Sequence, residues 1–112
     1  MAHKWYDIAE KKLDTEDEIQ ISYLGKLDGE YGYLCLSKRK LLFVNQEGFF
    51  RKSYKLTLVI PYEEIGRISH EGRYKLNLID VEGKKHDFVT SDLPESIIEK
   101  SLKDLISAGQ SH

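Results

Sequence analysis

The sequence predicts a mainly β (α+β) fold, with about seven short antiparallel strands between an N-terminal and a C-terminal helix. Three observations predict it. Apolar residues recur at helical spacing near both ends, they alternate with polar residues in between, and glycine-containing turns divide the alternating part. Because 112 residues suit one domain, we expect residues 1–112 to form a single unit: a helical extension over 1–17, strands over 18–91 and a helix over 92–108.

The first helix is predicted from an apolar stripe. Trp5, Ile8 and Leu13 fall on one helical face, and the acidic stretch 14–18 follows it. Negative charge at a helix C-terminus is unfavourable, so this helix needs tertiary contacts. We expect Trp5, Ile8 and Leu13 either to cover the rest of the fold or to form an oligomer contact.

The strands are predicted from alternation that begins at Ile19 and is broken by turn residues. Asp28-Gly29 is a strong hairpin signal, and Pro61 ends a later alternating run. Consecutive hairpins indicate an antiparallel barrel or sandwich. A barrel needs a cap at one open end, and the C-terminal helix is the obvious candidate.

That C-terminal helix is predicted from its cap and its stripe. Asp92 and Glu95 have capping-box spacing, and Pro94 suits a first turn. A broad apolar stripe follows, and Gly109 marks the expected end.

Composition excludes several classes of protein. There are 17 basic and 19 acidic residues, a net charge of −2, which argues against a general nucleic-acid binder. The single cysteine, Cys35, excludes an intrachain disulfide and suits a reducing compartment. No apolar run is long enough to span a bilayer, and the N-terminus lacks the apolar region of a signal peptide. We expect a cytoplasmic protein, with a peripheral position at the inner face of a membrane as the alternative.

Three segments resemble those of the pleckstrin-homology-like (PH-like) superfold, closest to its bacterial PH and GRAM-type branch. The first, residues 32–43, is similar to the family hairpin of an aliphatic strand, a basic turn and Leu-Leu-Phe. The second, residues 60–68, is similar to the Ile-Pro-x-x-(Asp/Glu)-Ile-x-x-Ile link. The third runs from Asp80 to Gly83 and on to Phe88 and the last helix. The resemblance covers roughly residues 18–106. It does not extend to the N-terminal helix or to the tryptophan that many eukaryotic PH domains carry in the last helix.

No catalytic constellation is apparent, and the resemblance implies a branch not known for intrinsic catalysis. His70 and His86 lack close spacing to cysteine or to each other, so no metal ligands are predicted. Cys35 lies in a hydrophobic strand, where a buried thiol without a visible activating partner is expected. We expect no catalytic residue, no metal and no cofactor.

The resemblance also maps a phosphoinositide pocket onto three loops, residues 26–30, 45–53 and 80–85. These loops hold five acidic and five basic residues, which makes a poor anion site. The charge is nevertheless uneven along the chain. Residues 37–55 hold six basic residues and one acidic residue, a net charge of +5, and residues 7–18 hold two basic and six acidic residues, a net charge of −4. This asymmetry predicts either attraction of anionic partners or pairing of the two regions, within one chain or between copies.

Phe49-Phe50-Arg51-Lys52 is the sharpest local feature. Adjacent aromatic residues on a regular strand face opposite sides, so at least one is exposed unless a bulge places both at the rim of the core. An apolar tip beside two cations suits an anionic membrane or a protein-docking hot spot. The candidate contact residues are Phe49, Phe50, Arg51, Lys52, Lys84 and Lys85.

The leading hypothesis is a non-enzymatic PH-like interaction module that contacts a protein or another copy of itself through loops or an open strand edge. Peripheral binding to anionic lipid is the alternative. A small-molecule carrier or enzyme ranks last, because small barrels are normally filled by their own side chains.

Overall fold

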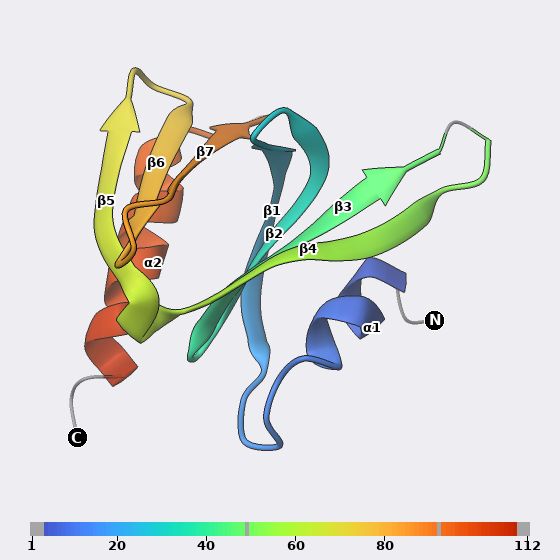
Figure 1. Ribbon diagram of the computed structural model, residues 1–112, viewed down its shortest axis with the longest axis horizontal. Coiled ribbons are helices and arrows are strands. Elements are labelled where there is room, and N and C mark those ends of the chain that lie inside the picture. The colour runs from blue at the N-terminus through green and yellow to red at the C-terminus, as the bar shows by residue number, and fades with distance from the viewer. Residues whose placement is uncertain (1–3, 49, 92, 110–112) are drawn as a thin grey trace.

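The computed structural model describes residues 4–48, 50–91 and 93–109. Figure 1 shows seven antiparallel strands with a helix at each end of the chain. The element bounds are α1 (Lys4–Glu10), β1 (Ile19–Leu27), β2 (Glu30–Ser37), β3 (Lys40–Glu47), β4 (Ser53–Pro61), the short 3-10 helix η1 (Tyr62–Glu64), β5 (Ile65–Glu71), β6 (Lys75–Asp80), β7 (Lys85–Thr90) and α2 (Glu95–Gly109). The predicted mainly β class is confirmed.

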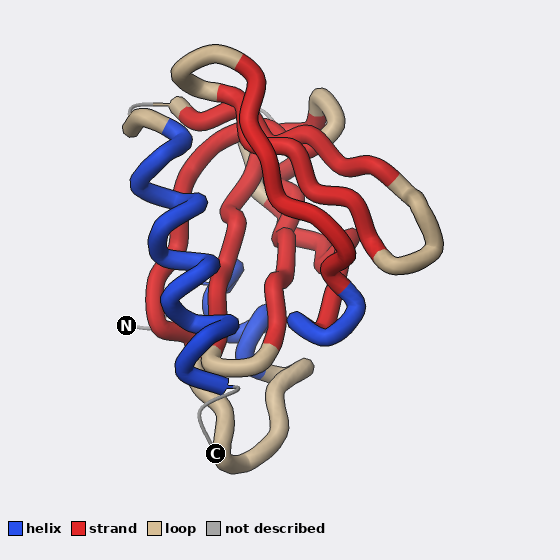
Figure 2. The backbone as a smooth tube through the Cα atoms, turned by 90° about the vertical axis from the view of Figure 1, so that its left-hand side faces the viewer, coloured by secondary structure: helices blue, strands red, loops and turns tan. Residues whose placement is uncertain are grey.

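The strands form one sheet in the order β4-β3-β2-β1-β7-β6-β5. The sheet is not closed into a barrel: within the described residues β4 and β5 are its two end strands, and the arrangement is sandwich-like. Residues 25–27 of β1 pair with β2 on one side and with residues 88–90 of β7 on the other. This pairing joins the β2–β4 half of the sheet to the β5–β7 half. The C-terminal helix α2 contacts β5 and β6 and runs alongside the strands (Figure 2).

The β1–β2 hairpin turns at the predicted Asp28-Gly29. Both residues have positive φ, 49° and 88°, as the two central residues of a type I′ turn require. The Asp28 carboxylate also accepts a hydrogen bond from the backbone N–H of Asp87 at 2.9 Å, and its other oxygen lies 3.1 Å from Nδ1 of His86. The turn residue therefore holds the first hairpin against β7.

Two glycines let the strands approach the core aromatics. Gly25 and Gly32 face each other across β1 and β2. A Cβ at Gly32 would lie 2.1 Å from the carbonyl oxygen of Val44, and one at Gly25 would lie 2.6 Å from the ring of Phe88. These positions accept no side chain, because the space belongs to backbone and to packed rings.

The main core lies inside the sandwich, where alternate residues of each strand meet α2. Phe43 and Phe88 pack edge to face with centroids 6.3 Å apart, and Leu34, Ile98 and Leu102 are fully buried around them. A second cluster lies on the outer face of β2 and β3, where Cys35, Leu42 and Val44 are buried beneath α1. Both faces of β2 and β3 are therefore covered, which is why these strands read as nearly continuous apolar runs.

The helices depart slightly from their predicted spans. The N-terminal helix ends at Glu10, and turns rather than helix carry the chain to Leu13. The helix α2 begins at Glu95, and Asp92, the other half of the predicted capping box, lies outside the described residues. Among the described helices, none is long and apolar enough to cross a bilayer.

Candidate functional site

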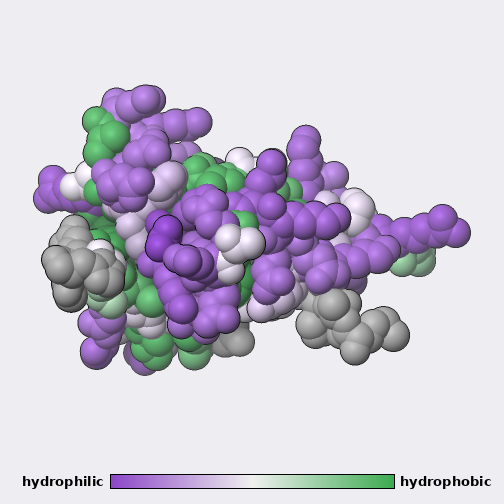
Figure 3. Space-filling model, turned by 90° about the horizontal axis from the view of Figure 1, so that it is seen from below, coloured by the Kyte–Doolittle hydropathy of each residue, from purple (hydrophilic) through white to green (hydrophobic). Residues whose placement is uncertain are grey.

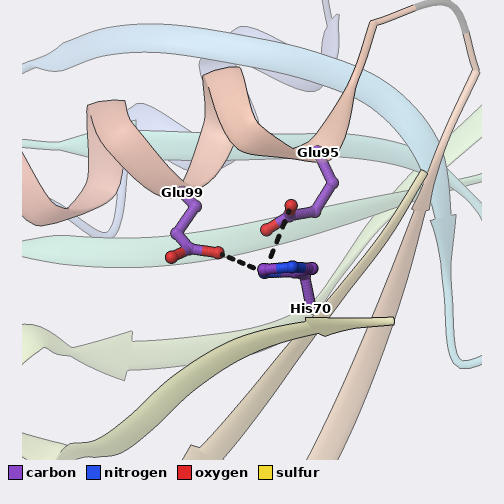
Figure 4. A group of neighbouring side chains, drawn as sticks. All are labelled: His70, Glu95 and Glu99. Atoms are coloured by element: carbon purple, nitrogen blue, oxygen red, sulfur yellow. Dashed lines mark hydrogen bonds and ion pairs between the residues drawn. The ribbon is translucent and has the colours of Figure 1, made fainter. Parts of the chain in front are cut away.

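Three potential ligand side chains meet where the end of β5 faces the start of α2. His70 is the next-to-last residue of β5 and is exposed, while Glu95 and Glu99 occupy the first turns of α2. Residues four apart on a helix share one face, so both carboxylates point the same way. Figure 4 shows them directed toward the His70 ring from the neighbouring helix.

The geometry is close and partly buried. Nδ1 of His70 lies 3.3 Å from Oε1 of Glu99 and 3.9 Å from Oε2 of Glu95. The Glu95 side chain is only 3% exposed, whereas that of His70 is 59% exposed. Glu99 also accepts a hydrogen bond from Nζ of Lys103 at 2.6 Å through its other oxygen. The cluster thus combines the buried carboxyl group of Glu95 with the exposed imidazole of His70.

The two carboxyls have opposite pKa shifts. Burial, followed by hydrogen bonding to Glu99 and the negative charge of Glu99, raises the pKa of Glu95 to about 7. Hydrogen bonding from Glu95, then from Lys103, lowers the pKa of Glu99 to about 2. Burial disfavours the charged form of Glu95, and donors favour the charged form of Glu99. In the isolated protein, Glu95 is therefore the carboxyl that retains a proton more readily.

An open hollow of about 470 Å³ lies beside the three side chains. Besides them it is lined by Gly72, Arg73, Pro94, Ser96 and Lys100. The backbone N–H of Glu95 donates to the carbonyl of Arg73 at 2.8 Å, which fixes the start of α2 to the β5–β6 turn. This arrangement offers a polar recess that water or a ligand can enter beside the edge of the sheet.

Sequence reasoning did not find this cluster, because it looked for ligands at short spacing. His70 and the glutamates are far apart in the chain and meet only when α2 packs beside β5. The one available signal was the Glu95–Glu99 pair on the predicted helix. In the sequence, Glu95 fits a capping box with Asp92, and Glu99 has no role in that motif.

The predicted partner or membrane contacts do not form one surface. Phe50, Arg51 and Lys52 lie at the β3–β4 turn, where Phe50 is 96% exposed. The turn that carries Lys84 lies near η1, on the opposite side of the view in Figure 1. Lys85 forms an ion pair with Glu71 at 3.5 Å. The remaining candidate, Phe49, lies outside the described residues.

The predicted helix contacts pack on their own sheet. Trp5 stacks on Tyr33 with centroids 4.3 Å apart and an angle of 9° between the rings. Ile8 and Leu13 pack against the same outer cluster, around buried Ala9 and Cys35. These side chains therefore cover the sheet within one chain, and the oligomer contact stays a prediction.

Part of the charge asymmetry is paired within the chain. Lys38 lies 3.6 Å from Glu18, and Arg39 lies 3.9 Å from Glu16, so the basic β2–β3 turn meets the acidic stretch after α1. A second hollow of about 980 Å³ adjoins this turn and is also lined by Leu105 and Ile106 near the end of α2. Seen from below, the described surface is largely hydrophilic, and apolar side chains show mainly between polar ones (Figure 3).

No protein-family model matches the chain, and no curated protein matches it significantly. The resemblance to the PH-like superfold therefore depends on the three sequence segments quoted above. The β5–α2 face combines a strand edge, a recess and a polar cluster.

Proposed function

We propose that the chain is a non-enzymatic interaction module of PH-like type, which binds an extended segment of a protein partner along the outer edge of β5. The observation that carries this proposal is the strand order. Within the described residues β5 pairs only with β6 and has no strand on its other side. An unpaired edge presents backbone donors and acceptors that an incoming strand can satisfy.

The recess beside β5 suits the binding of an added strand. Added strands gain affinity from backbone hydrogen bonds and specificity from pockets that receive alternate side chains. The 470 Å³ hollow lies next to the end of β5. Its lining includes two basic residues, Arg73 and Lys100, and two acidic residues, Glu95 and Glu99. The β4 edge ends in Pro61, which lacks a backbone donor, and this favours β5 as the edge that receives a strand.

The test is selection of displayed peptides on the full chain in the presence of a chelator, followed by amide chemical-shift mapping. We expect selected peptides to shift the amides of residues 65–71 and 95–100. Ser96→Trp, which fills the hollow, should weaken binding about tenfold or more. Ser53→Trp, at an exposed position of β4, is the matched control and should leave the affinity unchanged.

The molecular mass in solution distinguishes binding of a second copy from binding of another protein. A dimer in solution that Ser96→Trp dissociates and Ser53→Trp does not would identify the occupant of the edge as a second copy. Peptides that shift amides only in other elements, or a selection that enriches none, would contradict the proposal.

A second candidate function has one observation in its favour. Phe50 is 96% exposed at the β3–β4 turn, and Arg51 and Lys52 beside it are exposed as well. This combination suits peripheral contact with an anionic membrane. Co-sedimentation with vesicles of phosphatidylserine and phosphatidylcholine tests it. Phe50→Ser should reduce binding severalfold.

The matched control for that membrane test is Tyr74→Ser. Tyr74 is also an exposed aromatic beside an arginine at a turn, with the guanidinium of Arg73 lying 5.7 Å from the centre of its ring. No binding of the unaltered protein to anionic vesicles removes the membrane candidate, and equal effects of both substitutions remove the role of Phe50.

A further inference from the structure

We propose that His70, Glu95 and Glu99 form a binding site for a divalent transition-metal ion, with Zn²⁺ as the expected occupant. Their ligand atoms all lie within 4.8 Å of one another. Ligands about 2.0–2.1 Å from a tetrahedral zinc ion are separated from each other by about 3.3 Å. The His70 Nδ1 to Glu99 Oε1 distance is 3.3 Å, and the 3.9 Å distance from Nδ1 to Oε2 of Glu95 needs to shorten by about 0.6 Å to reach this separation.

A buried, unpartnered carboxylate oxygen points to a ligand independently of these distances. Oε1 of Glu95 is buried, and no hydrogen-bond donor among the described residues reaches it. The residue as a whole is 2% exposed. A buried carboxylate is costly unless it is paired or coordinates a metal. A cation bound between His70, Glu95 and Glu99 would give this oxygen a partner.

The elements that carry the ligands are already fixed in place. The start of α2 is tied to the β5–β6 turn through the Glu95 N–H, and His70 pairs with Leu76 in the sheet. Lys103 binds Oε2 of Glu99 and leaves Oε1 toward His70. Ligands held by second contacts of this kind favour metal binding, because little ordering remains to be done on association.

The donor set and the open side favour zinc over magnesium. Imidazole suits zinc and its transition-metal neighbours, whereas magnesium prefers oxygen ligands with near-octahedral geometry. Zinc sites with three protein ligands leave a fourth position to water or a bound molecule. The 470 Å³ hollow gives access to such a position, with Arg73 and Lys100 on its lining.

The test is calorimetric titration of Zn²⁺ into the chelator-stripped full chain near neutral pH, with Mg²⁺ titrated in parallel. The background protein carries His3→Ala and His112→Ala, so that the histidines near the chain ends do not contribute ligands. We expect one zinc site per chain and weak or absent magnesium binding. His70→Ala and Glu95→Gln should each lower zinc affinity by about 10–100-fold or more.

Glu71→Gln is the matched control. It removes a carboxylate from the next position of β5, where Glu71 pairs with Lys75 and Lys85 and lies outside the cluster. Its zinc affinity should equal that of the background protein. Thermal unfolding of each metal-free variant shows whether it folds.

A second measurement needs no substitution in the cluster. Histidine side-chain ¹⁵N spectra of the background protein should show that zinc shifts the ring nitrogens of His70 and leaves those of His86 unchanged. Absence of zinc binding, affinity that survives His70→Ala, or shifts confined to His86 would each overturn the proposal. Because the peptide selection is done with a chelator, the two proposals fail separately.

Discussion

The Ser37 hydroxyl donates a hydrogen bond to Oδ2 of Asp17 at 2.8 Å and so joins the segment after α1 to the β2–β3 turn. The other carboxylate oxygen, Oδ1, accepts from the backbone N–H groups of Glu18 and Lys38, each at 2.8 Å. Ser37 in turn accepts from the N–H of Lys40 at 2.9 Å. One buried carboxylate thus organises both the turn and the crossing of the N-terminal segment.

Asp17→Ala should lower the free energy of unfolding by roughly 2–4 kcal/mol, because it leaves buried donors of the turn without an acceptor. Chemical denaturation followed by circular dichroism measures this loss. Glu16→Ala is the control, since Glu16 is exposed and its ion pair with Arg39 is 3.9 Å long. It should change the free energy by no more than about 0.5 kcal/mol. Equal effects of the two substitutions would show that Asp17 does not organise the turn.

Gly32→Ala should destabilise the fold by roughly 1–3 kcal/mol, because the new methyl group would overlap the Val44 carbonyl oxygen and the Phe43 ring. Gly109→Ala is the comparison, since a Cβ there meets no atom within 4 Å. Melting temperatures of the two variants measure the difference. A melting temperature of Gly32→Ala that matches the unaltered protein would mean that β2 is not packed this closely against β3.

Asp28 contributes both a backbone conformation and two side-chain contacts, and two substitutions separate them. Asp28→Gly keeps the positive φ of 49° accessible but removes the contacts to His86 and to the Asp87 N–H. Asp28→Ala removes the contacts and adds strain of about 1 kcal/mol. We expect both variants to lose stability and the alanine variant to lose more. Denaturant midpoints rank them, and an alanine variant as stable as the glycine variant would exclude the type I′ conformation.

The Cys35 thiol should react very slowly in the folded protein. Burial raises its pKa from 9.0 to about 12, so at a given pH below 9.0 the thiolate fraction falls roughly a thousandfold. Iodoacetamide labelling followed by mass spectrometry should therefore show protection that denaturant abolishes. Trp5→Ala should speed labelling, because it removes the stacking on Tyr33 that holds α1 over this face. Lys4→Ala on the same helix should not speed labelling. Rapid labelling of the unaltered protein would contradict the burial of Cys35.

Local patterns predicted most of the fold. The alternation from Ile19, the Asp28-Gly29 turn and the apolar stripe of the last helix each correspond to an element with the expected type. Such signals are short-range, so they are visible in a single sequence. Whether the sheet closes into a barrel was harder to predict. The barrel alternative depended on pairing between β4 and β5, which no local pattern reports, and the sheet remains open between these strands.

The candidate site was hidden for a related reason. His70 had the spacing of an ordinary strand residue, and only the packing of α2 beside β5 places Glu95 and Glu99 next to it. In contrast, exposure of an aromatic residue at the β3–β4 turn followed from strand geometry, and Phe50 is exposed. The sequence could not place Lys84 relative to that turn, because their separation depends on how the two halves of the sheet are arranged.

The central place of β1 affects how the chain matures during translation. Its residues 25–27 need β2 on one side and residues 88–90 on the other. The first of these partners follows immediately, but the second leaves the ribosome only after every other strand has been made. A nascent chain that ends before β7 therefore exposes a bare β1 edge, to which a chaperone or a neighbouring nascent chain can add. Ribosomal pausing within residues 72–84 would lengthen that interval.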